Sequence, residues 1–96
     1  MLTAKEIEAK LREMKPFLAK QFKVKKIGYF GSFVTGEATE ESDIDILVDF
    51  SEPPGYEFFD LEDLLEGTFH RKIDLVSKNA LHKYLKDKIL NETIYV

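Results

Sequence analysis

The sequence contains no cysteine, no internal repeat, no low-complexity segment and no long uninterrupted apolar run. The absence of cysteine excludes a disulfide framework and any zinc site built on thiolates. Because no run reaches about 18 apolar residues, the sequence predicts no membrane-spanning helix. The N-terminal residues show no signal-peptide pattern, so we expect a cytoplasmic protein that does not bind membranes.

The chain also lacks a surplus of positive charge. It carries 14 Lys and Arg against 18 Asp and Glu, a net charge of −4. A protein that grips many phosphates usually displays a basic face, so we expect no extended nucleic-acid binding. Small anionic ligands that arrive with a metal ion are compatible with this charge. At this length we expect one domain, residues 1–96, that buries only about 60–65% of its unfolded surface.

The residues that suggest chemistry lie between Ile27 and Phe50, and the clearest of them are Asp43 and Asp45. They open an apolar run of strand type, and alternate residues of a strand share a face. Two carboxylates on one face can bind a hard cation such as Mg²⁺, whereas without a cation they repel by about 1–4 kcal/mol. The pattern predicts a metal site, and the alternative at this stage is a solvated surface strand.

A second signal is the pair Gly31-Ser32, which ends the apolar run that begins at Ile27. A strand that turns into a helix there exposes backbone N–H groups, and glycine lets an anion approach the backbone closely. The Ser32 hydroxyl can donate to a phosphate oxygen, or it can simply cap the helix. With the two aspartates, the pair predicts a phosphate site beside a metal site.

In this order the residues form the pattern G-S-x10-D-x-D followed by apolar residues. Over nearly its whole length the chain resembles the minimal nucleotidyltransferases of the DNA polymerase β superfamily. These include small proteins encoded beside HEPN-domain partners in prokaryotic toxin–antitoxin pairs. The resemblance implies Mg²⁺-dependent transfer of AMP from ATP to a hydroxyl group. The acceptor would be the hydroxyl of a tyrosine in a HEPN-type toxin, and this protein would be the antitoxin.

The resemblance also implies a role for each residue that matches the family motif. Asp43 and Asp45 would hold Mg²⁺, and Gly31 with Ser32 would bind the β- and γ-phosphates. Ser42 belongs to the motif and is predicted with Gly31 and Ser32 as part of the nucleotide-binding site, where it would support the backbone ahead of the aspartates.

The resemblance implies a third carboxylate on the strand beside the Asp-x-Asp strand. The run KIDLV places Asp74 there, where it would help to bind a second Mg²⁺ and to deprotonate the acceptor hydroxyl. Asp74 also interrupts an apolar run, and a buried carboxylate is rarely kept without a partner. The alternative from the residues alone is a strand-edge aspartate bonded to Arg71.

The remaining residues predict an α/β (α+β) fold, a mixed sheet of about four strands packed by about four helices. A capping box at Thr3–Glu6 starts the first helix, which Pro16 would either kink or divide into two. A helix from Tyr56 to Glu66 would end at Gly67. We expect strands at residues 27–30, 44–48, 73–76 and 93–96, and a last helix from Ser77 or Asn79 with Leu81, Leu85 and Ile89 on one face.

Two other functions stay open. The chain could neutralise its partner by contact alone, with a vestigial or regulatory nucleotide site. It could also modify a small molecule or a nucleic-acid end, although so short a chain has no evident acceptor pocket. An oligomer with the partner is compatible with all of these hypotheses. The aromatic residues Tyr56, Phe58 and Phe59 could stack a base, or they could belong to the core.

Overall fold

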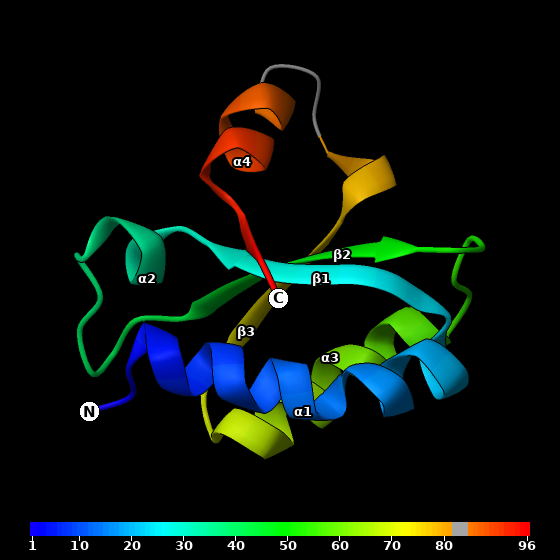
Figure 1. Ribbon diagram of the computed structural model, residues 1–96, viewed down its shortest axis with the longest axis horizontal. Coiled ribbons are helices and arrows are strands. Elements are labelled where there is room, and N and C mark those ends of the chain that lie inside the picture. The colour runs from blue at the N-terminus through cyan, green and yellow to red at the C-terminus, as the bar shows by residue number, and fades with distance from the viewer. Residues whose placement is uncertain (82–84) are drawn as a thin grey trace.

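A computed structural model describes residues 1–81 and 85–96 of the chain. It contains a four-stranded mixed sheet in the order β3-β2-β1-β4, with four α-helices and one 3₁₀-helix in the described part (Figure 1). The elements in chain order are α1 (Ala4–Phe22), β1 (Val24–Phe30), α2 (Ser32–Thr35), β2 (Ile44–Phe50), α3 (Glu57–Phe69), β3 (Ile73–Ser77), η1 (Lys78–Ala80), α4 (Lys86–Glu92) and β4 (Ile94–Tyr95). The predicted α+β fold is confirmed.

Helix α1 begins with the predicted capping box. The Thr3 hydroxyl accepts a hydrogen bond from the Glu6 N–H at 3.2 Å, and the Glu6 carboxylate accepts one from the Thr3 N–H at 3.1 Å. The helix continues through Pro16, so a division into two helices was wrong. A proline inside a helix costs about 3 kcal/mol. Burial of the opposite face, which includes the fully buried Leu11 and Leu18, offsets that cost.

Strand β2 lies in the middle of the sheet and separates two different surfaces. Its even-numbered residues Ile44, Ile46 and Val48 are fully buried in the main core, on the side covered by α1 and α3 (Figure 1). Its odd-numbered residues face the other side, where η1 and α4 lie. Leu47 is buried there but does not belong to the main core cluster. The strand thus supports the core with one face and carries its aspartates on the other.

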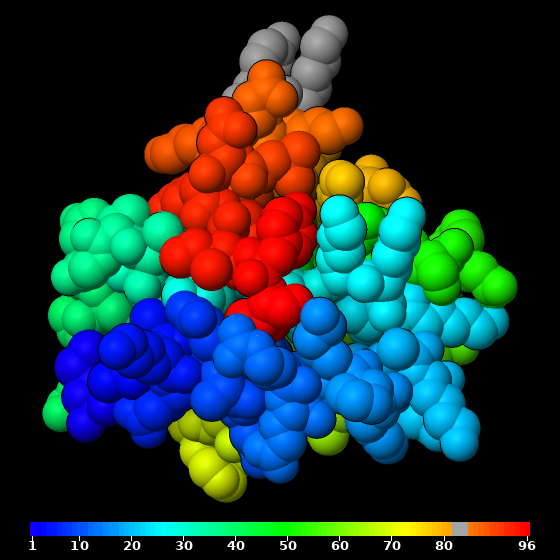
Figure 2. Space-filling view, in the orientation of Figure 1, coloured from blue at the N-terminus to red at the C-terminus, as the bar shows by residue number. Residues whose placement is uncertain are grey.

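The pairing of the strands brings distant parts of the chain together. Strand β1 is antiparallel to β2 and to β4, while β2 and β3 are parallel, as expected for strands joined by a helical crossover. The C-terminal residues fill the surface between α1 and α4 (Figure 2), where the Lys15 ammonium donates to the Val96 carbonyl at 2.8 Å. No helix in the described part of the chain is long and apolar enough to cross a membrane.

Two predicted helix boundaries were wrong. Helix α3 does not end at Gly67 but continues to Phe69, and His70 in the left-handed conformation (φ 52°) follows it. Packing of Phe69 against the core favours the longer helix. The predicted last helix is interrupted, because Leu81 has extended backbone (ψ 133°) after η1, and α4 begins only at Lys86. Residues 82–84 of that prediction lie outside the described residues.

Candidate active site

The parallel pairing of β2 and β3 sets Asp45 directly opposite Asp74. Paired residues of neighbouring strands point to the same face of a sheet, so the two carboxyl groups meet there. Partial burial raises the pKa of Asp45 to about 6, with further contributions from the charge of Asp74, a hydrogen bond with Asp74, and the charges of Asp43 and Glu92. This cluster of negative groups would bind a cation favourably.

Asp74 itself is exposed. The burial argument for its importance was therefore wrong, because the position lies on the open face of the edge strand. Its contact with Asp45 now carries the argument.

Asp43 lies two residues before Asp45, at the entrance to β2. Its carboxylate is 3.9 Å from the Lys72 ammonium; the Lys72 side chain is largely exposed and that of Asp43 is partly exposed, so this ion pair contributes at most about 1 kcal/mol. In residues 1–81 and 85–96, no three acidic, histidine or cysteine side chains already form a metal-binding cluster. The structure thus brings Asp45 and Asp74 together, with Asp43 beside them on a weakly held side chain. Carboxylate oxygens of this kind suit Mg²⁺.

Gly31 lies against the Asp45 carboxylate. A Cβ atom at this position would be 2.0 Å from Asp45 Oδ2, and the backbone has a φ of +76° that residues with side chains rarely adopt. Glycine is therefore required here for two independent reasons. The Gly-Ser turn and the Asp-x-Asp strand are adjacent in space, as their order along the chain predicted.

Ser32 is the first residue of α2, which has only four residues. So short a helix has a small dipole, so an anion here would be held mainly by individual donors. The N–H groups of Val34 and Thr35 donate to the Gly31 carbonyl, whereas those at the start of a helix have no intrahelical acceptor. An open pocket of about 430 Å³ lies over this turn, lined by Gly31, Ser32 and residues of α4.

Ser42 is not among the residues that line this pocket. Its hydroxyl accepts a hydrogen bond from the Thr39 N–H at 2.8 Å, and its carbonyl accepts one from Arg71 Nη1 at 2.9 Å. Arg71 also donates to the Thr39 carbonyl at 3.1 Å and lies over the Phe33 ring, 5.5 Å from its centroid. Ser42 thus fixes the backbone ahead of Asp43.

Arg71 holds the loop before β2 against α2, because its side chain donates hydrogen bonds to that loop and lies over the Phe33 ring of α2. From the sequence, Arg71 was expected only as a partner of Asp74. Its role in the loop was missed because bonds from a side chain to distant carbonyl groups leave no pattern in the sequence.

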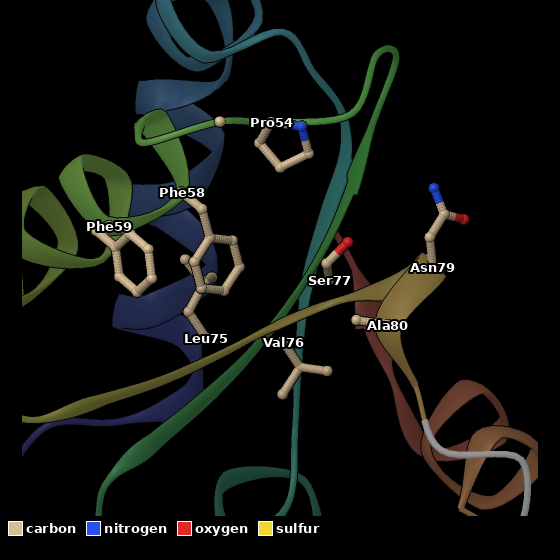
Figure 3. Close-up of a pocket in the computed structure, with 9 residues that line it drawn as sticks. Pro54, Phe58, Phe59, Leu75, Val76, Ser77, Asn79 and Ala80 are labelled. Carbon is tan, nitrogen blue, oxygen red and sulfur yellow. The ribbon is translucent and has the colours of Figure 1, made fainter.

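A second pocket of about 520 Å³ lies at the β3 edge of the sheet (Figure 3). Its lining is mostly apolar, with Leu75 beside Phe58 and Phe59, and with Ser77, Asn79 and Ala80 on the opposite side. None of the residues predicted for the phosphate and metal sites is among those that line it, whereas Phe58 and Phe59, which could stack a base, are. Phe58 packs on Phe50 with ring centroids 6.4 Å apart, as a core residue would, whereas Tyr56 and Phe59 are exposed.

Comparisons with known proteins identify the family to which the chain belongs. Residues 11–96 match the family model described as a nucleotidyltransferase domain. The protein adenylyltransferase MntA of Thermococcus cleftensis is 46% identical over 97 residues, which cover all of this chain and 98% of that protein. The solved structure of a protein described as a minimal nucleotidyltransferase is 30% identical, with a TM-score of 0.82 over 97% of this chain and 95% of the other.

One further solved structure shares the fold. It contains a tri-AMPylated HEPN toxin of Shewanella oneidensis in complex with an MNT antitoxin. The similarity has a TM-score of 0.70 at 19% identity and covers 97% of this chain and 71% of the matched chain.

Proposed function

The chain belongs to the nucleotidyltransferase domain family, and from this membership we propose that it transfers AMP from ATP to a tyrosine of a HEPN-type toxin and so acts as its antitoxin. The relative from Thermococcus cleftensis is named a protein adenylyltransferase. The observation in this chain that carries the proposal is the contact between Asp45 and Asp74 directly beside the Gly31-Ser32 turn.

Two Mg²⁺ ions would bind at the proposed site, and their ligands would be Asp43, Asp45 and Asp74. The fit rests on the three carboxylates: partial burial raises the pKa of Asp45, and the charges of Asp74 and Asp43 raise it further. When bound, Mg²⁺ would neutralise charge on the phosphate oxygens and favour ionisation of the acceptor hydroxyl.

The chain's own residues would position the substrates. Gly31 and Ser32 would bind the β- and γ-phosphates through backbone N–H groups and the Ser32 hydroxyl. The tyrosine oxygen would then form a bond to the α-phosphorus while the bond to the β-phosphate oxygen breaks, which releases pyrophosphate. Asp74, on the edge strand, would face the incoming hydroxyl and favour the loss of its proton. Ser42 would keep Asp43 in place through the backbone.

The test uses α-labelled ATP, Mg²⁺ and the HEPN-domain protein encoded beside this chain. We expect label on the partner, with a mass gain of one or more AMP units. A parallel reaction with γ-labelled ATP should leave the partner unlabelled, because the γ-phosphate departs with pyrophosphate. The double variant Asp43→Asn, Asp45→Asn should lose the labelling.

Asp49→Asn is the matched control. Asp49 lies on the same face of β2 but beyond Leu47, and it is 4.0 Å from the Lys78 ammonium rather than beside Asp45. This variant should label the partner normally. If the double variant still neutralised the toxin fully, neutralisation by contact alone would replace nucleotidyl transfer as the function.

A further inference from the structure

Helix α4 forms one wall of the pocket over the Gly31-Ser32 turn. Lys88, Ile89 and Glu92 line the pocket from α4, although they are more than 50 residues from the turn in the sequence. Figures 1 and 2 show α2 beside the C-terminal part of the chain that contains α4. The last helix therefore does more than cover the sheet, because it completes the cavity above the predicted phosphate site.

The described lining of the pocket contains more acidic residues than basic ones. Of the described residues that line it, Glu37 and Glu92 are acidic and only Lys88 is basic. In the described part of the chain no carboxylate lies within ion-pair distance of Lys88, since the ion pairs found there involve other lysines. Lys88 is thus a positive charge that is free to bind a ligand.

Lys88 and Glu92 occupy successive turns of α4 on the same side of the helix. Glu92 lines the pocket together with Gly31, which lies against the Asp45 carboxylate, so the Glu92 end of the wall lies near the carboxylate cluster. Four residues of helix rise about 6 Å, so Lys88 lies one turn, roughly that distance along α4, from Glu92. A ligand that extends from the carboxylates past Ser32 toward Lys88 would be long and negatively charged at its far end.

We propose that Lys88 binds the terminal phosphates of the nucleotide and makes the site select a triphosphate over a monophosphate. The inference rests on the proposed function for the identity of the ligand, and it assigns a specificity-determining contact to the last helix. Because two acidic residues share the pocket, loss of Lys88, the one basic residue of its described lining, leaves a described wall that repels phosphate. The contribution of Lys88 therefore should depend on how many phosphates the ligand carries.

The test measures binding of ATP and AMP to the full chain in Mg²⁺ by calorimetry. Replacement of a charged hydrogen-bond donor typically weakens binding about tenfold or more. We expect Lys88→Ala to weaken ATP binding by that factor while AMP binding changes little, so that the preference for ATP falls. Lys88→Arg keeps the charge and should retain the preference.

Lys86→Ala is the matched control, because Lys86 is an exposed lysine of the same helix that does not line the pocket. It should bind both nucleotides as the unmodified protein does. Circular dichroism of each variant checks that the fold is retained. Equal weakening of ATP and AMP, unchanged ATP binding, or no ATP binding by the unmodified protein would overturn the inference.

The two proposals fail separately. If the unmodified protein binds ATP in a Lys88-dependent way but labels no partner, the proposed transfer fails and the role of Lys88 stands. If it labels the HEPN-domain partner and Lys88→Ala does so with unchanged KM for ATP, the role of Lys88 fails and the transfer stands.

Discussion

Gly31→Ala is expected to damage both the stability of the protein and the geometry of its site, and Gly36→Ala separates the two causes of damage. Both glycines have positive φ, +76° and +83°. At Gly36 an added Cβ would meet no atom within 4 Å, whereas at Gly31 it would lie 2.0 Å from Asp45 Oδ2. The first variant therefore strains the backbone and displaces a carboxylate, while the second strains only the backbone.

The expected costs follow from these contacts. A residue with a side chain in the left-handed region costs about 1–2 kcal/mol, which is the expected loss for Gly36→Ala. Gly31 has a ψ of −144°, in a region that is even less accessible to other residues, where strain is about 1–3 kcal/mol. Displacement of Asp45 adds to this strain. We therefore expect Gly31→Ala to lose about 1–2 kcal/mol more than Gly36→Ala.

Urea unfolding followed by circular dichroism measures these losses, and partner labelling measures the effect on the site. A double-mutant cycle with Asp45→Ala identifies the clash, because Gly31→Ala should cost less where the carboxylate is already absent. The reasoning is refuted if the two glycine variants lose the same stability, or if the cost of Gly31→Ala is unchanged in the Asp45→Ala background.

Three further predictions concern other parts of the molecule. In metal-free buffer the pKa of Asp45 is higher in the folded protein than in the unfolded chain, so ionisation of Asp45 opposes folding. The contribution of Asp45 to the free energy of unfolding should therefore fall as pH rises from about 4 to about 6. Asp45→Asn should remove that pH dependence and, after allowance for partial exposure, stabilise the metal-free protein at pH 7 by about 1 kcal/mol in thermal melts. Arg71→Ala should reduce partner labelling much more than it reduces stability, because it releases the loop that precedes Asp43; an unchanged labelling rate would contradict this role. Leu65→Ala should lower the free energy of unfolding by about 2–5 kcal/mol in urea, since Leu65 is fully buried in the core. A loss below about 1 kcal/mol would mean that the surrounding core side chains fill the space left by the deleted atoms.

Much of the fold was predictable because its signals are local or strictly periodic. The capping box at Thr3 involves four consecutive residues, and the alternation along β2 assigns Ile44 and Ile46 to one face and Asp45 to the other. The parallel pairing that joins Asp45 to Asp74 is the usual result of a helical crossover between two strands. These features depend on chain geometry that any similar sequence would share.

The less predictable features depend on packing between distant segments. Apolar spacing alone could not show that the backbone becomes extended at Leu81, or that Gly67 lies inside a helix held by Phe69. For the same reason the pocket wall of Lys88 and Glu92 was not anticipated, because its position depends on where α4 packs. The role of Arg71 depends on carbonyl groups some 30 residues earlier in the chain.

The two-sided character of β2 has a consequence for how this protein can change over evolution. Substitutions at the even-numbered positions act on the core, and substitutions at Asp45 act on the site, so either property can vary while the other is preserved. An insertion or deletion of one residue within the strand has no such freedom, because it would exchange the two faces at once. Length variation among relatives should therefore gather in the loop from Gly36 to Ser42, outside the strand that both properties share.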